Sequence, residues 1–352
     1  DRPAILAAFA AAKECGEPAT VVFEEQHYLL GDNPNAWHAF TLSGFTNLVI
    51  EGNGATLLSS KHGLSFYFKD SRNVTVRGLT LDETSPRFSQ GEVVAVNASG
   101  FMDVKIMEGY PEPPVEAFMT ANNHLAHGGG GRHMIVFEKG GASRNMMMTA
   151  DHLYIENIRK VSDGVFRFFV KEDYLKYFPG VAVGNWITYG FCFVDVPRPI
   201  VDAKFKSDSI YGQIEADRVE NMTFEDINIY GSINGGIRVS DMPGDVTVRN
   251  VNIVRKPGTK NLVSIPSDAL HLMSIRGRLL VEDCLIEAPG DDCLNIGTLM
   301  DTIISRDKTN PRRMTLRTTD NLYYYYTIEK GDRLQFMDFE SKQVLGVATV
   351  EE

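Results

Sequence analysis

A short motif that returns along the chain constrains the fold more than any other feature. Each copy reads as a turn residue, a short strand of mainly apolar and β-branched side chains, a charged residue and then Gly, Asn or Asp. The copies are Asn47-Leu-Val-Ile-Glu-Gly, Asn73-Val-Thr-Val-Arg-Gly, Asp151-His-Leu-Tyr-Ile-Glu-Asn, Asn221-Met-Thr-Phe-Glu-Asp, Asp245-Val-Thr-Val-Arg-Asn and Arg278-Leu-Leu-Val-Glu-Asp. The offset is 26 residues from Asn47 to Asn73, 24 from Asn221 to Asp245 and 33 from Asp245 to Arg278. A period in this range is typical of solenoids, in which each repeat stacks on the one before it.

A second short apolar strand follows the motif, as in Leu79-Thr-Leu, Ile227-Asn-Ile and Val251-Asn-Ile. Short alternating strands with no helix-length segment between them disfavour a doubly wound α/β fold. A β-sandwich would also contain short alternating strands, but it would not repeat one strand–bend–strand unit with the same boundary residues. The repeat therefore predicts an all-β chain folded as a parallel β-helix.

Three segments depart from the repeat. Pro3 to Cys15 has apolar residues at helical spacing and is followed by Gly16, which predicts a short helix capping the first coil. The predicted organisation is β-helix coils with this capping helix in residues 1–164, an inserted β-barrel-like module in 165–206, further coils in 207–297 and a second β module in 298–352. Because the chain ends inside that second module, either the module caps the solenoid or the chain is a piece of a longer protein, and we expect the second.

The composition argues against several classes of protein. A formal net charge of −11 over 352 residues disfavours a nucleic-acid partner, because phosphate contacts need clustered Lys and Arg. The four cysteines contain no Cys-x-x-Cys pair, so neither a zinc site nor a disulfide framework is expected. No apolar run approaches the roughly 20 residues that span a bilayer. We expect no bound metal or other cofactor and no membrane insertion, whereas a homo-oligomer stays open.

Three carboxylates are predicted to converge one coil apart. Asp268 precedes Asp291 by 23 residues, and Asp291 is followed directly by Asp292. Residues one coil apart stack on neighbouring strands about 4.8 Å from each other. Carboxylates at that separation repel one another and raise at least one pKa, as a general acid requires. The alternative is that Gly290-Asp-Asp is an ordinary turn with solvated acids.

These segments also carry a resemblance to known families. The chain resembles the pectin-lyase-like right-handed β-helix superfamily, and an Asp followed one coil later by Gly-Asp-Asp is similar to the polygalacturonases. The Gly-His-Gly and Arg-x-Lys motifs that continue that family do not follow Asp292. Asp268-Ala-Leu-His271, Arg276-Gly-Arg-Leu-Leu-Val-Glu-Asp-Cys and Asp291-Asp-x-x-Asn-Ile-Gly look more like glycoside hydrolase family 110, the α-1,3-galactosidases. Ile296 stands where that family would lead us to expect a second His.

The resemblance implies an inverting, exo-acting hydrolase that cleaves α-galactosidic, most simply α-1,3, linkages. Asp291 would be the general acid, and Asp268 and Asp292 would hold and deprotonate the water. His271 would bind a sugar hydroxyl, or else be a structural imidazole paired with a neighbouring carboxylate. Asn295 would contact substrate, or else belong to an asparagine ladder of the β-helix. The implied partner is a galactose-containing glycan, and the implied location is secreted or periplasmic.

Two other functions fit the same fold. One is another polysaccharide-degrading enzyme, polygalacturonase-like or a calcium-dependent lyase, which would need carboxylates around the ion and a Lys or Arg base. The other is a β-helical carbohydrate-binding protein without catalysis. Trp37 and Trp186 could each stack on a sugar ring, although burial is the simpler expectation for both.

Overall fold

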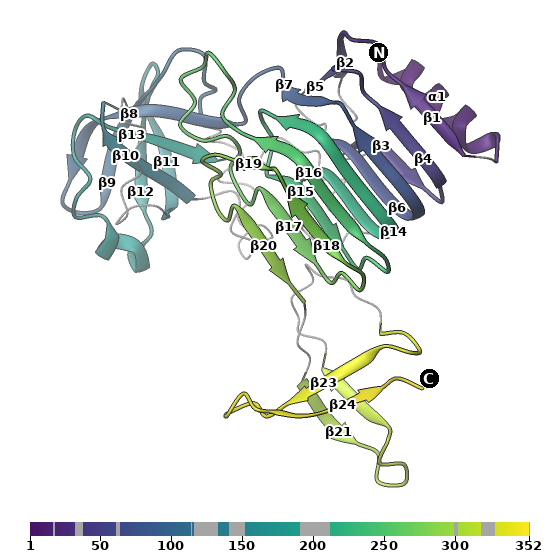
Figure 1. Ribbon diagram of the computed structural model, residues 1–352. Coiled ribbons are helices and arrows are strands. Elements are labelled where there is room, and N and C mark those ends of the chain that lie inside the picture. Colours follow the sequence, from purple (N-terminus) through teal and green to yellow (C-terminus); the bar gives the residue numbers. More distant parts are fainter. Residues whose placement is uncertain are drawn as a thin grey trace. The chain divides into compact units, whose positions relative to one another are not determined.

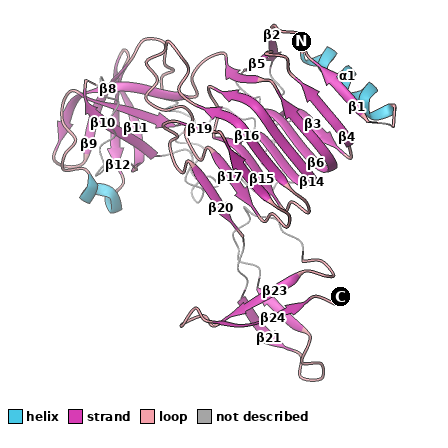
Figure 2. Cartoon of the chain, viewed as in Figure 1, coloured by secondary structure: helices cyan, strands magenta, loops and turns pink. Residues whose placement is uncertain are grey.

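The computed structural model describes residues 1–16, 18–31, 38–60, 64–113, 115, 133–140, 152–190, 212–298, 302–317 and 328–351. The chain divides into two compact units, Asp1–Thr298 and Leu299–Glu352. The described residues are predominantly β-strand (Figure 2), as the sequence predicts. None of the helices in the described part of the chain is long and apolar enough to cross a membrane.

The first unit contains a long parallel sheet whose strands stack in three ladders (Figure 1). The first ladder contains β1 (Ala19–Val22), β4 (Thr46–Glu51), β6 (Leu64–Arg77), β14 (Gly212–Ile229), β16 (Val246–Ile253) and β18 (Leu279–Glu282). The second ladder contains β3 (His38–Ser43), β6, β14, β15 (Gly235–Ser240), β17 (Leu270–Met273) and β20 (Leu294–Gly297). The third ladder contains β2 (His27–Gly31), β5 (Thr56–Ser59), β7 (Thr80–Glu83), β14, β16 and β19 (Leu285–Ile286).

The turn residue that opens each motif copy explains why the copies stack. Asn47, Asn73 and Asn221 all adopt the left-handed conformation, with φ of 55°, 52° and 63°, which Asn tolerates better than most residues. The Asn73 amide donates to the Asn47 side-chain oxygen at 2.7 Å, and the Asn221 amide donates to that of Asn73 at 2.9 Å. Asp245 continues the stack, because its backbone N–H donates to the Asn221 side chain at 3.0 Å.

Contacts between adjacent strands also explain why a charged residue stands near the end of the motif. In the first ladder the register places Glu51, Arg77, Glu225, Arg249 and Glu282 side by side. Arg77 donates to Glu51 at 2.6 Å, and Arg249 donates to Glu225 at 3.1 Å and also to Glu282. Opposite charges on adjacent strands favour this register over one shifted by a residue.

One hydrophobic core receives side chains from all three ladders. Phe40, Phe66 and Phe68 are fully or almost fully buried in it, and the rings of Phe66 and Phe68 stack with centroids 5.8 Å apart. Helix α1 (Arg2–Glu14) confirms the predicted N-terminal helix. Its Ile5 and Phe9 are buried, and the Phe9 ring meets the edge of Phe40 at 5.5 Å, so the helix packs on the core beside the first strands. These features are compatible with a parallel β-helix.

In the sequence, a closed six-stranded barrel lies between β7 of the third ladder and β14. Its strands are β8 (Phe88–Asn97), β9 (Phe101–Ile106), β10 (His133–Lys139), β11 (Leu153–Ser162), β12 (Val165–Val170) and β13 (Asn185–Gly190), with the 3-10 helix η1 (Glu172–Tyr177) between the last two. Val104, Phe166, Phe168 and Ile187 are among the side chains of its core.

The barrel begins much earlier than the predicted module at residues 165–206. Phe88 to Ser162, which the sequence assigns to β-helix coils, supplies four of its strands, and residues 191–206 lie outside the described part. The copy at Asp151-His-Leu-Tyr-Ile-Glu-Asn leads into β11, which pairs antiparallel with β12 rather than with a neighbouring coil. An alternating strand has the same local pattern in a barrel and in a coil, so the motif alone could not distinguish them.

The second unit corresponds to the residues for which the sequence predicts a second β module. Its described residues form two antiparallel pairs, β21 (Thr302–Arg306) with β22 (Met314–Arg317) and β23 (Arg333–Met337) with β24 (Val344–Thr349).

Candidate active site

The three carboxylates selected from the sequence lie together in the first unit. Asp268 stands two residues before β17, and Asp291 and Asp292 stand just before β20. The Ala269 N–H donates to the Asp292 carbonyl at 2.8 Å. This hydrogen bond holds the segment before β17 beside the segment before β20. One carboxylate oxygen from each of the three residues lies within 4.8 Å of the others. Asp268 is buried with 5% exposure, whereas Asp291 and Asp292 are exposed. The predicted convergence is therefore present in the structure.

Gly290 allows this arrangement for a reason that the sequence did not reveal. Its N–H donates to the Ile265 carbonyl at 2.8 Å, so the backbone at Gly290 lies directly against the backbone at Ile265. A Cβ atom at Gly290 would lie 2.4 Å from the carbonyl oxygen of Pro266. The position requires glycine because two backbones approach closely, and this approach places the adjacent aspartates beside Asp268.

The pKa of Asp291 is raised above its usual range. Although the residue as a whole is exposed, partial loss of hydration at its carboxyl group makes the largest contribution, and the Asp268 charge adds to it. The positive potential of His152 lowers the pKa, and the neighbouring Asp292 raises it again by a smaller amount. A carboxyl group whose pKa is raised by burial and by like charges is better suited to donate a proton.

His271 is tied to Asp268. Its ring Nδ1 lies 2.6 Å from Asp268 Oδ2, and its side chain is 2% exposed. This is the pairing of an imidazole with a neighbouring carboxylate that the sequence left open. The predicted contact of His271 with a sugar hydroxyl stays a prediction.

Asn295 bridges two of the three carboxylates. Its Nδ2 lies 3.3 Å from Asp268 Oδ2 and 3.2 Å from Asp292 Oδ2, so one amide group donates to both. Among the described residues, asparagine ladders run elsewhere, for example from Asn252 to Asn228 at 3.1 Å. Asn295 therefore orders the carboxylate pair rather than continuing a ladder, and its role as a substrate contact stays a prediction.

The barrel contributes residues to the site that no sequence motif indicates. His152 and Tyr154 lie close enough to Asp291 for the charges to interact: His152 lowers the pKa of Asp291. The pKa of Tyr154 is raised by burial first, then by Tyr174 and by the Asp291 charge. The ring of Tyr154 packs on that of Tyr174 with centroids 4.5 Å apart. His152 and Tyr154 are more than 130 positions before Asp291, and no motif links them to it.

Polar side chains at aligned positions of adjacent strands in the second ladder form a row that ends at the carboxylate cluster. The strand register aligns Glu215 with Arg238, Arg238 with His271 and His271 with Asn295. The Arg238 guanidinium lies 3.9 Å from the Glu215 carboxylate, and both side chains are buried. Arg238 is thus a buried basic residue one strand from His271, and no sequence motif connects it with Asp291.

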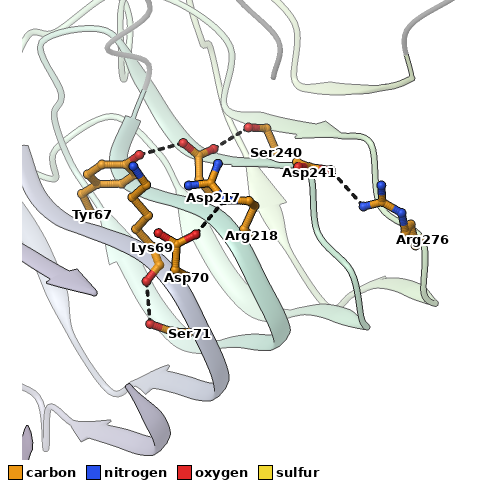
Figure 3. A network of polar contacts seen from close by, with 9 residues as sticks. All are labelled: Tyr67, Lys69, Asp70, Ser71, Asp217, Arg218, Ser240, Asp241 and Arg276. Carbon is orange, nitrogen blue, oxygen red and sulfur yellow. Dashed lines mark hydrogen bonds and ion pairs between the residues drawn. The ribbon is translucent and has the colours of Figure 1, made fainter. Parts of the chain in front are cut away.

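A second polar row lies on the same ladder (Figure 3). Asp217 accepts hydrogen bonds from the Tyr67 hydroxyl at 2.7 Å and from Ser240. Beyond it, Arg276 donates to Asp241 at 2.9 Å. Burial and the Asp217 charge raise the pKa of Tyr67, so its phenol stays protonated. These bonds join successive strands and stiffen the ladder that carries the carboxylates.

The carboxylate cluster could also hold a divalent cation. Three oxygens within 4.8 Å of one another suit a hard ion such as Ca²⁺. Both a hydrolase and a metal-dependent lyase use such a cluster of carboxylates.

Comparison with known proteins supports the hydrolase. No protein-family model matches the chain. An α-1,3-galactosidase A of Shewanella woodyi is 24% identical over 265 residues, covering 73% of this chain and 40% of the relative. An α-1,3-galactosidase A of Akkermansia muciniphila is 26% identical over 143 residues, covering 38% of this chain and 23% of that relative. The predicted resemblance to the α-1,3-galactosidases is thereby confirmed, and these matches span less than half the length of each relative.

Proposed function

We propose that this chain carries the catalytic carboxylates of an exo-acting, inverting glycoside hydrolase that cleaves α-galactosidic linkages, most simply α-1,3, in oligo- or polysaccharides. The observation that carries the proposal is the convergence of Asp268, Asp291 and Asp292 within 4.8 Å. The names of the two relatives supply the substrate class, which the carboxylates alone do not specify.

The residues divide into an acid and a water-holding pair. Asp291, whose pKa is raised, protonates the glycosidic oxygen as the bond to the anomeric carbon breaks. Asp268 and Asp292 hold a water and remove its proton as it attacks that carbon. His271 positions Asp268 through its 2.6 Å contact, and Asn295 keeps the Asp268 and Asp292 carboxylates in a fixed relation.

The spacing of the carboxylates bears on the stereochemical outcome. Inverting enzymes with two carboxylates usually hold them about 6.5–9.5 Å apart, whereas retaining enzymes hold them about 5–5.5 Å apart. The nearest oxygens here are closer than the inverting range. We assign inversion because the third carboxylate lets Asp268 and Asp292 bind the water together, with no second acid needed as a nucleophile. The anomer released first decides between the two outcomes.

We further infer that the three ladders are the faces of a right-handed parallel β-helix, because one core joins them and the motif copies stack coil on coil. A substrate of this kind is met outside the cell, so we propose that the protein is secreted or periplasmic.

A calcium-dependent polysaccharide lyase is the second candidate, and two observations favour it. The carboxylate cluster suits a cation, and Arg238 is a basic residue one strand from His271. A lyase would lose activity in EDTA and release unsaturated products, whereas the hydrolase would keep its activity and release galactose.

The hydrolase is tested by comparing release of galactose from an α-1,3-linked galactoside by wild type and Asp291→Asn. We expect the variant to lose roughly 10²- to 10⁴-fold in rate, the usual contribution of a general acid. Asp163→Asn is the matched control, because Asp163 is a fully exposed carboxylate of the barrel hairpin. Equal rates in all three proteins would refute the assignment of Asp291.

A further inference from the structure

A cavity of about 760 Å³ lies in the first unit, where the barrel meets the turns that lead from the third ladder to the second. Its aromatic walls are Phe88, Tyr110, Trp186 and Tyr230. None of the three clustered carboxylates lines it. Its volume is in the range of small-molecule sites, and a partly apolar lining with a few placed polar groups is typical of them.

The aromatic walls are held in place by the packing around them. Tyr110 and Trp186 pack against a buried cluster that joins the barrel residues Phe88, Ile135 and Phe137 to Leu262 and Val263. The next residue on β13, Ile187, points into the barrel core, so Trp186 faces outward toward the cavity.

Hydrogen bonds also join the barrel side of the cavity to residues 260–262. The buried amide of Gln90 donates to the Lys260 carbonyl at 2.9 Å and accepts from the Leu262 N–H at 2.9 Å. The Tyr110 hydroxyl donates to the Asn261 side chain at 2.8 Å. The cavity therefore exists before any ligand binds, which lowers the cost of ordering it.

The polar groups of the cavity select the chemistry of the ligand. Asp82 and Glu83 are buried, and Lys256 is paired with Asp82 at 2.5 Å. Glu92, Glu108, Lys105 and Lys260 also line the cavity, so its four carboxyl groups outnumber its three ammonium groups. These carboxyl groups disfavour phosphate and other anions. They equally disfavour a wholly apolar ligand, because their hydrogen-bonding capacity would be left unmatched.

A neutral ligand with many hydroxyls and an apolar face satisfies both conditions. Hydroxyls can bond to carboxyl and amide groups, while the C–H face of a pyranose packs on tryptophan or tyrosine rings. Burial raises the pKa of Glu83 to about 8, which leaves it largely uncharged at neutral pH and able both to donate and to accept.

We propose that this cavity is a second carbohydrate-binding site, separate from the clustered carboxylates, that takes a neutral sugar unit between Trp186 and Tyr230. The site does not depend on the proposed catalytic function, because it uses none of the residues assigned to catalysis. It would hold one part of a glycan while another part reaches the carboxylates, or retain the protein on its substrate.

Tryptophan fluorescence gives a direct test. The chain contains only two tryptophans, so Trp37→Phe leaves Trp186 as the sole reporter. Titration of this variant with D-galactose and with α-1,3-galactobiose should give a saturable change in Trp186 emission. The change should persist when Asp268→Asn and Asp291→Asn are added, because the cavity is separate from the carboxylates. Adding Tyr230→Ala instead should weaken binding roughly tenfold, about 1.4 kcal/mol.

Three results would overturn the proposal. The first is the absence of any saturable change up to the solubility limit of both sugars. The second is loss of the change in the Asp268→Asn, Asp291→Asn background, which would assign the signal to the carboxylate site. The third is an equal change with inorganic phosphate, which would make the cavity an anion site. Phe339→Ala, which removes an exposed ring of the second unit, controls for a general loss of aromatic surface.

Discussion

Glu83 carries an electrostatic cost that substitution should relieve. Burial raises its pKa from 4.5 to about 8, and the nearby charge of Arg87, whose Nε lies 3.4 Å away, only partly offsets that effect. A folded-state pKa above the unfolded value means that the folded state binds the proton more tightly. Between pH 4.5 and about 8 the unfolded chain therefore holds fewer protons than the folded one, and stability falls as pH rises.

The size of the effect follows from the shift. Each pH unit above 4.5 costs about 1.4 kcal/mol until the folded-state pKa is reached, so the cost at pH 7 is about 3 kcal/mol. Glu83→Gln replaces the carboxyl by a neutral group of the same shape, and Arg87 keeps its hydrogen bond to the Ser60 carbonyl. We expect the variant to be more stable than wild type by about 3 kcal/mol at pH 7 and by little near pH 4.5.

Urea unfolding of both proteins at several values from about pH 5 to about pH 8 measures this difference. The reasoning requires the gap in free energy of unfolding to widen steadily with pH. A gap that stays constant with pH, or a wild type that is the more stable protein at pH 7, would refute it. The second outcome would mean that Glu83 is ionised and that its ion pair with Arg87 dominates.

Three further predictions concern the site and its supports. His271→Gln should lower kcat at least tenfold, leave KM nearly unchanged and shift the pH–rate profile, because His271 positions Asp268; a rise in KM alone would instead make it a sugar contact. Gln90→Ala should cost about 1–3 kcal/mol in urea unfolding, since two backbone groups lose a buried partner, and an unchanged midpoint would contradict this. Gly290→Ala should abolish hydrolysis because its Cβ meets backbone 2.4 Å away, whereas Gly346→Ala, with nothing within 4 Å, should be as active as wild type.

Local features explain why so much of the parallel sheet could be predicted. A turn residue that tolerates positive φ, a β-branched strand and a charged residue each reflect one contact with the next coil, as Asn73 and Arg77 illustrate. The clustering of Asp268 with Asp291 follows from the same period, because their offset of 23 residues is within one residue of the offset of 24 between paired residues of β17 and β20.

The barrel and its contribution to the site could not be predicted in this way. Its strands pair antiparallel across separations with no fixed period, as when β10 pairs with β13. The approach of His152 and Tyr154 to Asp291 depends on how the barrel packs, which no local pattern encodes. The need for glycine at position 290 likewise arises from a backbone contact with Pro266 that exists only in the folded chain.

We propose that Asp268, Asp291 and Asp292 together hydrolyse an α-galactoside with inversion. Proton NMR of the anomeric signal during cleavage of an α-1,3-linked galactoside tests it most directly, with Asp291→Asn as the inactive comparison. We predict that β-galactose appears first and that mutarotation produces the α anomer later. Release of α-galactose first would contradict inversion, and its loss in Asp291→Asn would then assign a retaining mechanism to the same carboxylates.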